Sequence, residues 1–180
     1  LVPKNVIALV DSPSVPHSEI QPMDVGETRI FLRHAESHRL GSLFTLMVAC
    51  GLRIGEALAL HWSDVDTEKG SLSVRYTLQR NDGQWQFLEP KSERSRRTLP
   101  MPDIAVGALK RHWIHQVEER LKVGRAWMEQ DLVFTTHIGG PLMSRNVMRD
   151  FHALLMQAGL RHQRLHDLRH GCASLLAASG

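Results

Sequence analysis

The feature that most restricts the fold is a segment of eleven residues, Leu40 to Cys50, that is apolar on nearly every side of a helix. A helix of this kind is buried at the centre of a helical domain. The segment is far shorter than the roughly 20 apolar residues that a membrane-spanning helix needs. We therefore expect a globular domain built around this central helix, and we expect no membrane as a partner.

Local signals predict further helices around the central one. Asp24 followed by Glu27 has the spacing of a capping box and begins a helix. Gly51 interrupts the apolar segment, and the i, i+3, i+4 spacing of Ile54, Ala57 and Leu58 then predicts a short helix. The expected ranges are 24–38, 40–50, 54–60, a long helix through Leu109, Trp113, Val117 and Leu121, 144–158 with Ser144 as N-cap and Gly159 at its end, and 166–179.

The pattern changes to alternation after Gly70. Leu72, Val74, Tyr76 and Leu78 alternate with polar residues, which predicts one half-buried strand. Asn81-Asp82-Gly83 is a turn signal, and 85–88 is expected to return as the second strand. With a third short strand at 97–100, the sequence predicts a mainly helical α+β fold with a small three-stranded antiparallel sheet.

Length and composition fit one domain with an arm. The chain has 180 residues, 42% of them hydrophobic, which excludes a disordered protein. Residues 1–20 are rich in proline and have no sustained periodicity, so they are expected to form a linker or extended arm before a domain at 21–180. The two cysteines, Cys50 and Cys172, are too few for a disulfide scaffold and favour a reducing cytoplasm.

Two basic clusters matter more than the formal charge of +3. The first contains Lys91, Arg94, Arg96 and Arg97. The second contains Arg161, Arg164 and Arg169, with His162 and His166 between them and His170 directly after them. The clusters would form one site for a polyanion if the fold brings them together, and they would be two solvated loops if it does not.

Two pairs of residues have a spacing that suits chemistry. Arg53 and Glu56 lie at i and i+3, where the carboxylate could orient the guanidinium next to the core, or the two could form an ordinary exposed ion pair. His166 and Arg169 repeat this spacing and could combine proton transfer with charge stabilisation at a phosphate, or be a surface pair at the start of a helix. The interleaved arginines would repel a dication, so no metal is expected at the histidines.

Taken in order, three segments resemble the catalytic domain of the tyrosine recombinases, the phage-integrase family. They are Ala49-Cys50-Gly51-Leu52-Arg53-Ile54-Gly55-Glu56-Ala57-Leu58, then Pro90-Lys91 before Arg96-Arg97-Thr98-Leu99-Pro100, then His166-Asp167-Leu168-Arg169-His170. The resemblance covers about residue 20 to residue 180. Asn5 to Pro16 is similar to the segment that joins the family's N-terminal core-binding domain to its catalytic domain.

The resemblance implies site-specific DNA recombination or integration through a covalent 3′-phosphotyrosyl intermediate, without a metal or other cofactor. It implies that Arg53 and Arg169 hold the phosphate, Lys91 protonates the departing 5′-oxygen, His166 assists proton transfer and Glu56 supports the site. Duplex DNA is the implied partner, with Arg94, Arg96, Arg97 and His170 as further DNA-binding residues. Self-association on DNA is implied for the full-length protein, in the cytoplasm and at the nucleoid of a bacterium or a phage host.

Two departures from the family pattern set the remaining expectations. Gly171 replaces the threonine that follows the second histidine. The family's nucleophilic tyrosine lies well beyond the His-x-x-Arg segment, whereas the only tyrosine here is Tyr76, expected to be a core residue. We therefore expect a C-terminally truncated domain that binds DNA without cleaving it covalently. The alternatives are a non-catalytic DNA-binding regulator or relic, and a helical interaction module, which would leave Arg53, Lys91 and Arg169 unexplained.

Overall fold

A computed structural model of the chain describes residues 21–89 and 96–169. The predicted arm at 1–20, Lys91, Arg94 and the predicted final helix from His170 onward lie outside these residues. The helices are α1 (Val25–Ala35), α2 (Gly41–Cys50), α3 (Ile54–Leu58), α4 (Asp103–Val123) and α5 (Ser144–Gln157), with short 3₁₀ turns η2 (Trp62–Asp64), η4 (Gly124–Ala126) and η5 (Leu165–Asp167).

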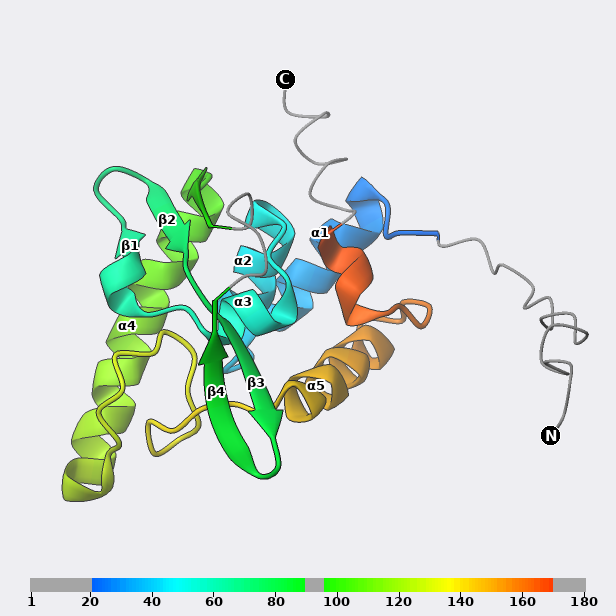
Figure 1. The fold of residues 1–180 in the computed structure, drawn as a ribbon. Helices are drawn as coiled ribbons and strands as arrows, with labels where there is room; N and C mark the ends of the chain where they lie inside the picture. Colours follow the sequence, from blue (N-terminus) through cyan, green and yellow to red (C-terminus); the bar gives the residue numbers. More distant parts are fainter. Residues whose placement is uncertain (1–20, 90–95, 170–180) are drawn as a thin grey trace, which may run out of the picture.

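Helix α2 lies at the centre of the helical part, as its sequence predicts (Figure 1). It packs against α1 and α4, and the rings of Phe31, Phe44 and Phe151 bring α1, α2 and α5 together with centroids 5.3–5.9 Å apart. All three phenylalanines are fully buried. Edge-to-face and tilted aromatic packing of this kind adds to the stability that burial itself provides.

The helix ends follow the predicted local signals closely. The Asp24 carboxylate accepts a hydrogen bond from the Glu27 amide at 2.7 Å, and the Glu27 carboxylate accepts one from the Asp24 amide at 3.0 Å. Helix α2 ends at Gly51, which has a φ of +60°. At α5 the prediction is wrong by one residue, because the extended backbone of Met143 is the N-cap and Ser144 is already helical.

The sheet region differs from the prediction in its pairing. The strands are β1 (Val65–Asp66), β2 (Ser71–Val74), β3 (Thr77–Asn81), β4 (Gln84–Leu88) and β5 (Arg97–Pro100). A three-stranded antiparallel sheet does form, but in the order β1-β2-β5, and β3 and β4 form a separate hairpin. The predicted single strand through residues 72–79 is therefore wrong, because the chain leaves one sheet after Val74 and enters the other at Thr77.

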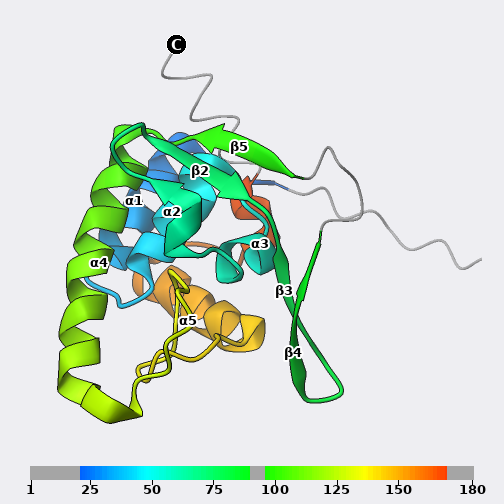
Figure 2. The same cartoon turned by 60° about the vertical axis from the view of Figure 1, so that its left-hand side comes forward.

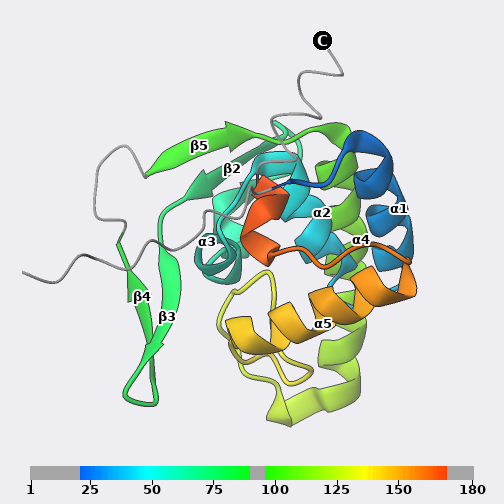
Figure 3. The same cartoon turned by 90° about the vertical axis from the view of Figure 1, so that its right-hand side faces the viewer.

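A contact between separate elements lies at the break in this strand, and hydrophobic alternation does not reveal it. Arg75 turns its guanidinium back to the buried carboxylate of Asp64, in the 3₁₀ turn before β1. Leu72, Val74 and Leu78 remain buried on both sides of the break, so the hydrophobic alternation continues across it. The predicted turn is confirmed: Asp82 and Gly83 both have positive φ, and the hairpin they close extends away from the helices (Figures 2 and 3).

Helix α4 is confirmed, but only the first residue of its predicted apolar series is buried. Leu109 is fully buried, whereas Trp113 is 48% and Leu121 is 76% exposed. A step of four residues advances about 400° around a helix, so such a series drifts off the buried face. Polar residues continue the buried face in its place, and His112 and Gln116 hydrogen-bond to backbone carbonyls of residues 132–133.

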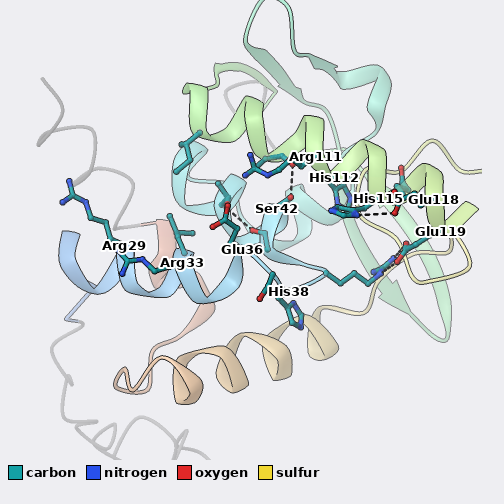
Figure 4. A pocket seen from close by; sticks show the side chains of 18 of the residues that line it. Arg29, Arg33, Glu36, His38, Ser42, Arg111, His112, His115, Glu118 and Glu119 are labelled. Atoms are coloured by element: carbon teal, nitrogen blue, oxygen red, sulfur yellow. Dashed lines mark hydrogen bonds and ion pairs between the residues drawn. The ribbon is translucent and has the colours of Figure 1, made fainter.

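A groove of about 840 Å³ lies between α1, the start of α2 and α4, and His112 forms part of its wall (Figure 4). Burial lowers the pKa of His112 below its ordinary value, so its imidazole is neutral in the folded protein and donates to the Val133 carbonyl at 2.7 Å. Within the described residues, no helix combines the length and the hydropathy needed to cross a membrane.

We expect the protein to lose stability between pH 7.5 and pH 5.5 because of His112. The unfolded chain binds a proton at this residue near pH 6.5, whereas burial lowers the pKa of His112 in the folded protein, so acid favours unfolding. A difference of one proton costs about 1.4 kcal/mol per pH unit. Urea denaturation at the two pH values should show a smaller loss in His112→Gln than in the wild type. An equal loss in both proteins would contradict this assignment.

Candidate functional site

Arg53 occupies the junction between the central helix and α3. The left-handed Gly51 ends α2, the buried Leu52 fixes the connection, and Arg53 then has the extended backbone of a helix N-cap. Its side chain is 52% exposed, whereas that of Glu56, one turn later, is 5% exposed. The predicted pair therefore consists of a solvent-facing guanidinium and a buried carboxylate.

The carboxylate of Glu56 accepts four hydrogen bonds. Arg53 donates its backbone N–H to Oε2 at 2.9 Å and its Nη1 to Oε1 at 3.0 Å. Arg97, at the start of β5, donates Nη1 to Oε1 at 3.1 Å and Nη2 to Oε2 at 2.9 Å. Burial alone would raise the pKa of Glu56, but the bonds from Arg97 and Arg53 outweigh it and hold the pKa below its ordinary value. Glu56 is thus a buried, ionised anchor for two arginines.

The His166–Arg169 segment is held by its apolar neighbours. Leu165 and Leu168 are buried in the core, which leaves His166 exposed and Arg169 partly buried in the 3₁₀ turn η5 and the helical residues after it. Within the described residues, Nη1 of Arg169 is buried and has no hydrogen-bond partner. A buried guanidinium N–H without an acceptor is costly unless a ligand supplies one.

The elements that carry these residues lie together. Figures 2 and 3 show α3, β5 and the described end of the chain at η5 on the same side of the molecule. Residues 53–56, 97 and 166–169, from three distant parts of the sequence, therefore belong to elements on one side of the molecule. Convergence of Arg53, His166 and Arg169 with Lys91 stays a prediction, because Lys91 lies outside the described residues.

The second basic cluster is not one exposed cationic patch. Arg161 donates to the carbonyls of Gln21 and Pro22 at 2.9 and 3.0 Å and pairs with Glu27, so it fastens the start of the domain to the segment before η5. Arg164 pairs with Asp167 at 3.5 Å. The contacts of Arg161 join residues 134–140 positions apart, and no spacing in the sequence pointed to them.

The first cluster is also partly engaged within the protein. Arg96 pairs with Glu89 at 2.5 Å, and Arg97 is bound to Glu56. DNA binding by Arg96 and Arg97 stays a prediction, as it does for Arg94 and His170, which lie outside the described residues. The role of Arg97 beside Glu56 was missed, because 41 positions separate them and no local pattern joins β5 to α3.

Tyr76 lies between β2 and β3 and is partly buried against the core. Its ring contacts that of His61 with centroids 6.3 Å apart. The prediction of a core residue is therefore confirmed in that the ring packs on the core, although it is not fully covered. Across residues 21–89 and 96–169, no three His, Cys, Asp or Glu residues are arranged to hold a metal ion.

Comparison with known proteins gives a consistent result. Residues 23–180 match the family model described as the phage integrase family. The chain is 32% identical over 175 residues to a tyrosine recombinase XerC-like protein of Caldanaerobacter subterraneus subsp. tengcongensis, covering 91% of this chain and 45% of that protein. It is 31% identical over 187 residues to an integrase of Streptomyces ambofaciens, covering 99% and 48%. The chain thus spans about half the length of these relatives.

Solved structures show the same fold. The Tn1549 transposon integrase in complex with transposon right end DNA superposes with a TM-score of 0.75 at 20% identity, covering 99% of this chain and 59% of that one. A lambda integrase dimer bound to a COC′ core site gives a TM-score of 0.65 at 19% identity, covering 98% and 46%. The mainly helical α+β fold with small antiparallel sheets is therefore confirmed.

Proposed function

Because the chain belongs to the phage integrase family, we propose that it acts in site-specific DNA recombination or integration, as part of the catalytic domain of a tyrosine recombinase. The relatives that support this are themselves named recombinases and integrases. The structural neighbours include integrases in complex with DNA. The lambda integrase is a dimer on its DNA, which supports the further proposal that the full-length protein self-associates on DNA.

The reaction proposed for the full-length protein is transesterification at one DNA phosphate, in which a tyrosine oxygen bonds to phosphorus as the bond from phosphorus to the 5′-oxygen breaks. Negative charge develops on the non-bridging oxygens, and Arg53 and Arg169 are the groups proposed to hold them through paired hydrogen bonds. Lys91 is proposed to protonate the departing 5′-oxygen, and His166 to assist proton transfer. Glu56 does not meet the phosphate in this proposal, because its two oxygens already bind Arg53 and Arg97.

The observation that carries the proposal is the buried Nη1 of Arg169, which has no partner in the described part of the chain. A phosphate oxygen is a suitable acceptor for it. Arg53, next to α3, is half exposed and commits one guanidinium nitrogen, Nη1, to Glu56. Its Nε and Nη2 are therefore the groups proposed to bind the same phosphate. Arg94, Arg96 and His170 are proposed to bind neighbouring backbone phosphates.

We expect the 180-residue chain to bind duplex DNA weakly and in a salt-dependent way. Four to six phosphate contacts correspond to a slope of roughly −4 to −5 for log affinity against log salt, and a Kd of about 10⁻⁴ to 10⁻⁶ M. Fluorescence anisotropy with a labelled duplex measures both quantities. Arg53→Gln and Arg169→Gln should each weaken binding and reduce the slope by about one.

The matched control is Arg125→Gln. Arg125 is exposed in η4, at the end of α4 that lies farthest from α3 (Figure 1). Affinity should change less in this variant than in Arg169→Gln, although all three variants lose one positive charge. Equal losses would show that binding depends only on net charge, and binding that is independent of salt would overturn the phosphate-contact proposal.

We also propose that this chain is catalytically incomplete by itself. Tyr76 is its only tyrosine, and the ring packs between β2 and β3 on the core. A suicide DNA substrate should therefore give no covalent adduct in a denaturing gel. An adduct that disappears in Tyr76→Phe would overturn this proposal. DNA binding without an adduct is expected both for an incomplete recombinase domain and for a non-catalytic DNA-binding regulator.

A further inference from the structure

Among the residues predicted to bind DNA, Arg97 is the one whose observed contacts fit that role least well. Its guanidinium makes two parallel hydrogen bonds to the two oxygens of Glu56, at 3.1 and 2.9 Å. This bidentate arrangement is the strongest that an arginine makes with a carboxylate. The Arg97 side chain is 23% exposed, compared with 52% for Arg53 and 55% for the adjacent Arg96.

We propose that Arg97 is a positioning residue, which acts on the phosphate site through Glu56 and Arg53 and does not itself bind DNA. This proposal rests on the function proposed above, because it assigns Arg97 a role at that same site. Arg97 anchors β5 to the first turn of α3, so that Glu56 is held where it meets both the backbone N–H and the guanidinium of Arg53.

Charge balance gives Arg97 a second effect. With Arg97 present, one carboxylate is shared between two guanidinium groups, and the three residues carry a net charge of +1. Without Arg97, Glu56 would be paired with Arg53 alone and would neutralise it. The exposed Arg53 would then attract a phosphate less strongly, because its charge is already balanced. Arg97 thus keeps Arg53 cationic toward an incoming anion.

The groups around Glu56 define how this effect depends on pH. In the described residues, the charged groups that act on Glu56 are Arg53, at the start of its own helix, and Arg97, on β5. Strand β3 faces α3 at Gly55 through the uncharged hydroxyl of Thr77. In Arg97→Gln, burial acts on Glu56 with one arginine fewer to oppose it, so the pKa of Glu56 rises. Protonation would then release Arg53 as the pH falls.

The decisive experiment is a double-mutant cycle on duplex DNA affinity, with anisotropy of a labelled duplex as the probe. We expect Arg97→Gln to weaken binding roughly fivefold in the wild type and less than twofold in a Glu56→Gln background. We also expect binding by Arg97→Gln, relative to the wild type, to recover as the pH is lowered. This recovery should be absent from the double variant, which lacks the titrating carboxylate.

A direct phosphate contact gives the opposite results. The loss caused by Arg97→Gln would then be the same in both backgrounds, and the salt slope would fall by about 0.9 in each. These outcomes would overturn the positioning role and leave the proposed function standing. If the wild-type chain does not bind duplex DNA at all, the proposed function itself fails.

Arg97→Lys provides a test that does not depend on the folding of Glu56→Gln. Lysine keeps the positive charge but loses the planar fork that matches a carboxylate. Because a lysine serves well as a point charge for a phosphate, a direct contact predicts affinity within twofold of the wild type and an unchanged slope. Lysine preserves the charge balance at Glu56 but cannot bind both of its oxygens, so the positioning role predicts at least a threefold loss of affinity through the lost geometry. A result within twofold would overturn the proposal.

Discussion

Gly41→Ala is expected to destabilise the protein by about 3 kcal/mol, toward the upper end of what overpacking of a core costs. A Cβ atom at this position would lie 2.1 Å from the carbonyl oxygen of Ala35 and 3.0 Å from its carbonyl carbon. Both are backbone atoms at the end of α1, so no side chain can rotate away to make room. The connection between α1 and α2 would have to open, which would disturb the packing of Phe31 and Ala35 on α2.

Thermal unfolding monitored by circular dichroism should show the midpoint falling by roughly 9 °C. Gly107→Ala is the matched control, since Gly107 lies inside α4 and a Cβ there would meet only Arg111 Nη1, at 3.5 Å. This substitution should raise stability by up to about 1 kcal/mol through helix propensity. If the two variants changed the unfolding midpoint by a similar amount in the same direction, the close approach of α1 to α2 at Gly41 would be contradicted.

The features that could be predicted from the sequence are those whose cause is local. The Asp24–Glu27 capping box, the end of α2 at Gly51 and the Asp82-Gly83 turn each depend on a few adjacent residues, and all three are confirmed. The Arg53–Glu56 pair is likewise a local contact, because a spacing of three residues places both on one side of a helical turn. The pairing of His166 with Arg169 stays a prediction.

The features that were missed depend on tertiary contacts. The strand through residues 72–79 divides where Arg75 turns back to Asp64, and hydrophobic alternation continues unchanged across the division. Arg97 and Arg161 were both assigned to solvent-facing basic clusters, because charge patterning shows where cations are and not which carboxylates they reach. Their partners, Glu56 and Glu27, lie 41 and 134 positions away.

The buried carboxylate of Glu56 should contribute about as much to the free energy of unfolding as the close packing at Gly41 does. Replacing Glu56 by glutamine removes the negative charge that both guanidinium groups share. The glutamine side-chain NH₂ group, a donor, would then face N–H donors of the arginines. Breaking a buried ion pair by removing one partner costs about 3–5 kcal/mol, and the half-exposed Arg53 reduces this cost because water can reach it. We therefore expect Glu56→Gln to lower the free energy of unfolding by about 3 kcal/mol at pH 7.5.

The loss should depend on pH in a defined direction. Because the pKa of Glu56 is held below its ordinary value of 4.5 in the folded protein, its contribution is fully present above that value and is lost as the pH falls through the folded-state pKa. Urea denaturation should thus show a constant gap between wild type and Glu56→Gln from pH 7.5 down to about pH 5, and a gap that shrinks once the pH falls below 4.5. Glu68→Gln, at an exposed position, should show almost no gap at any of these pH values. A gap that stays constant below pH 4.5 as well would mean that glutamine disturbs the packing around α3 and that the ionised carboxylate is not what holds Arg53 and Arg97 in place.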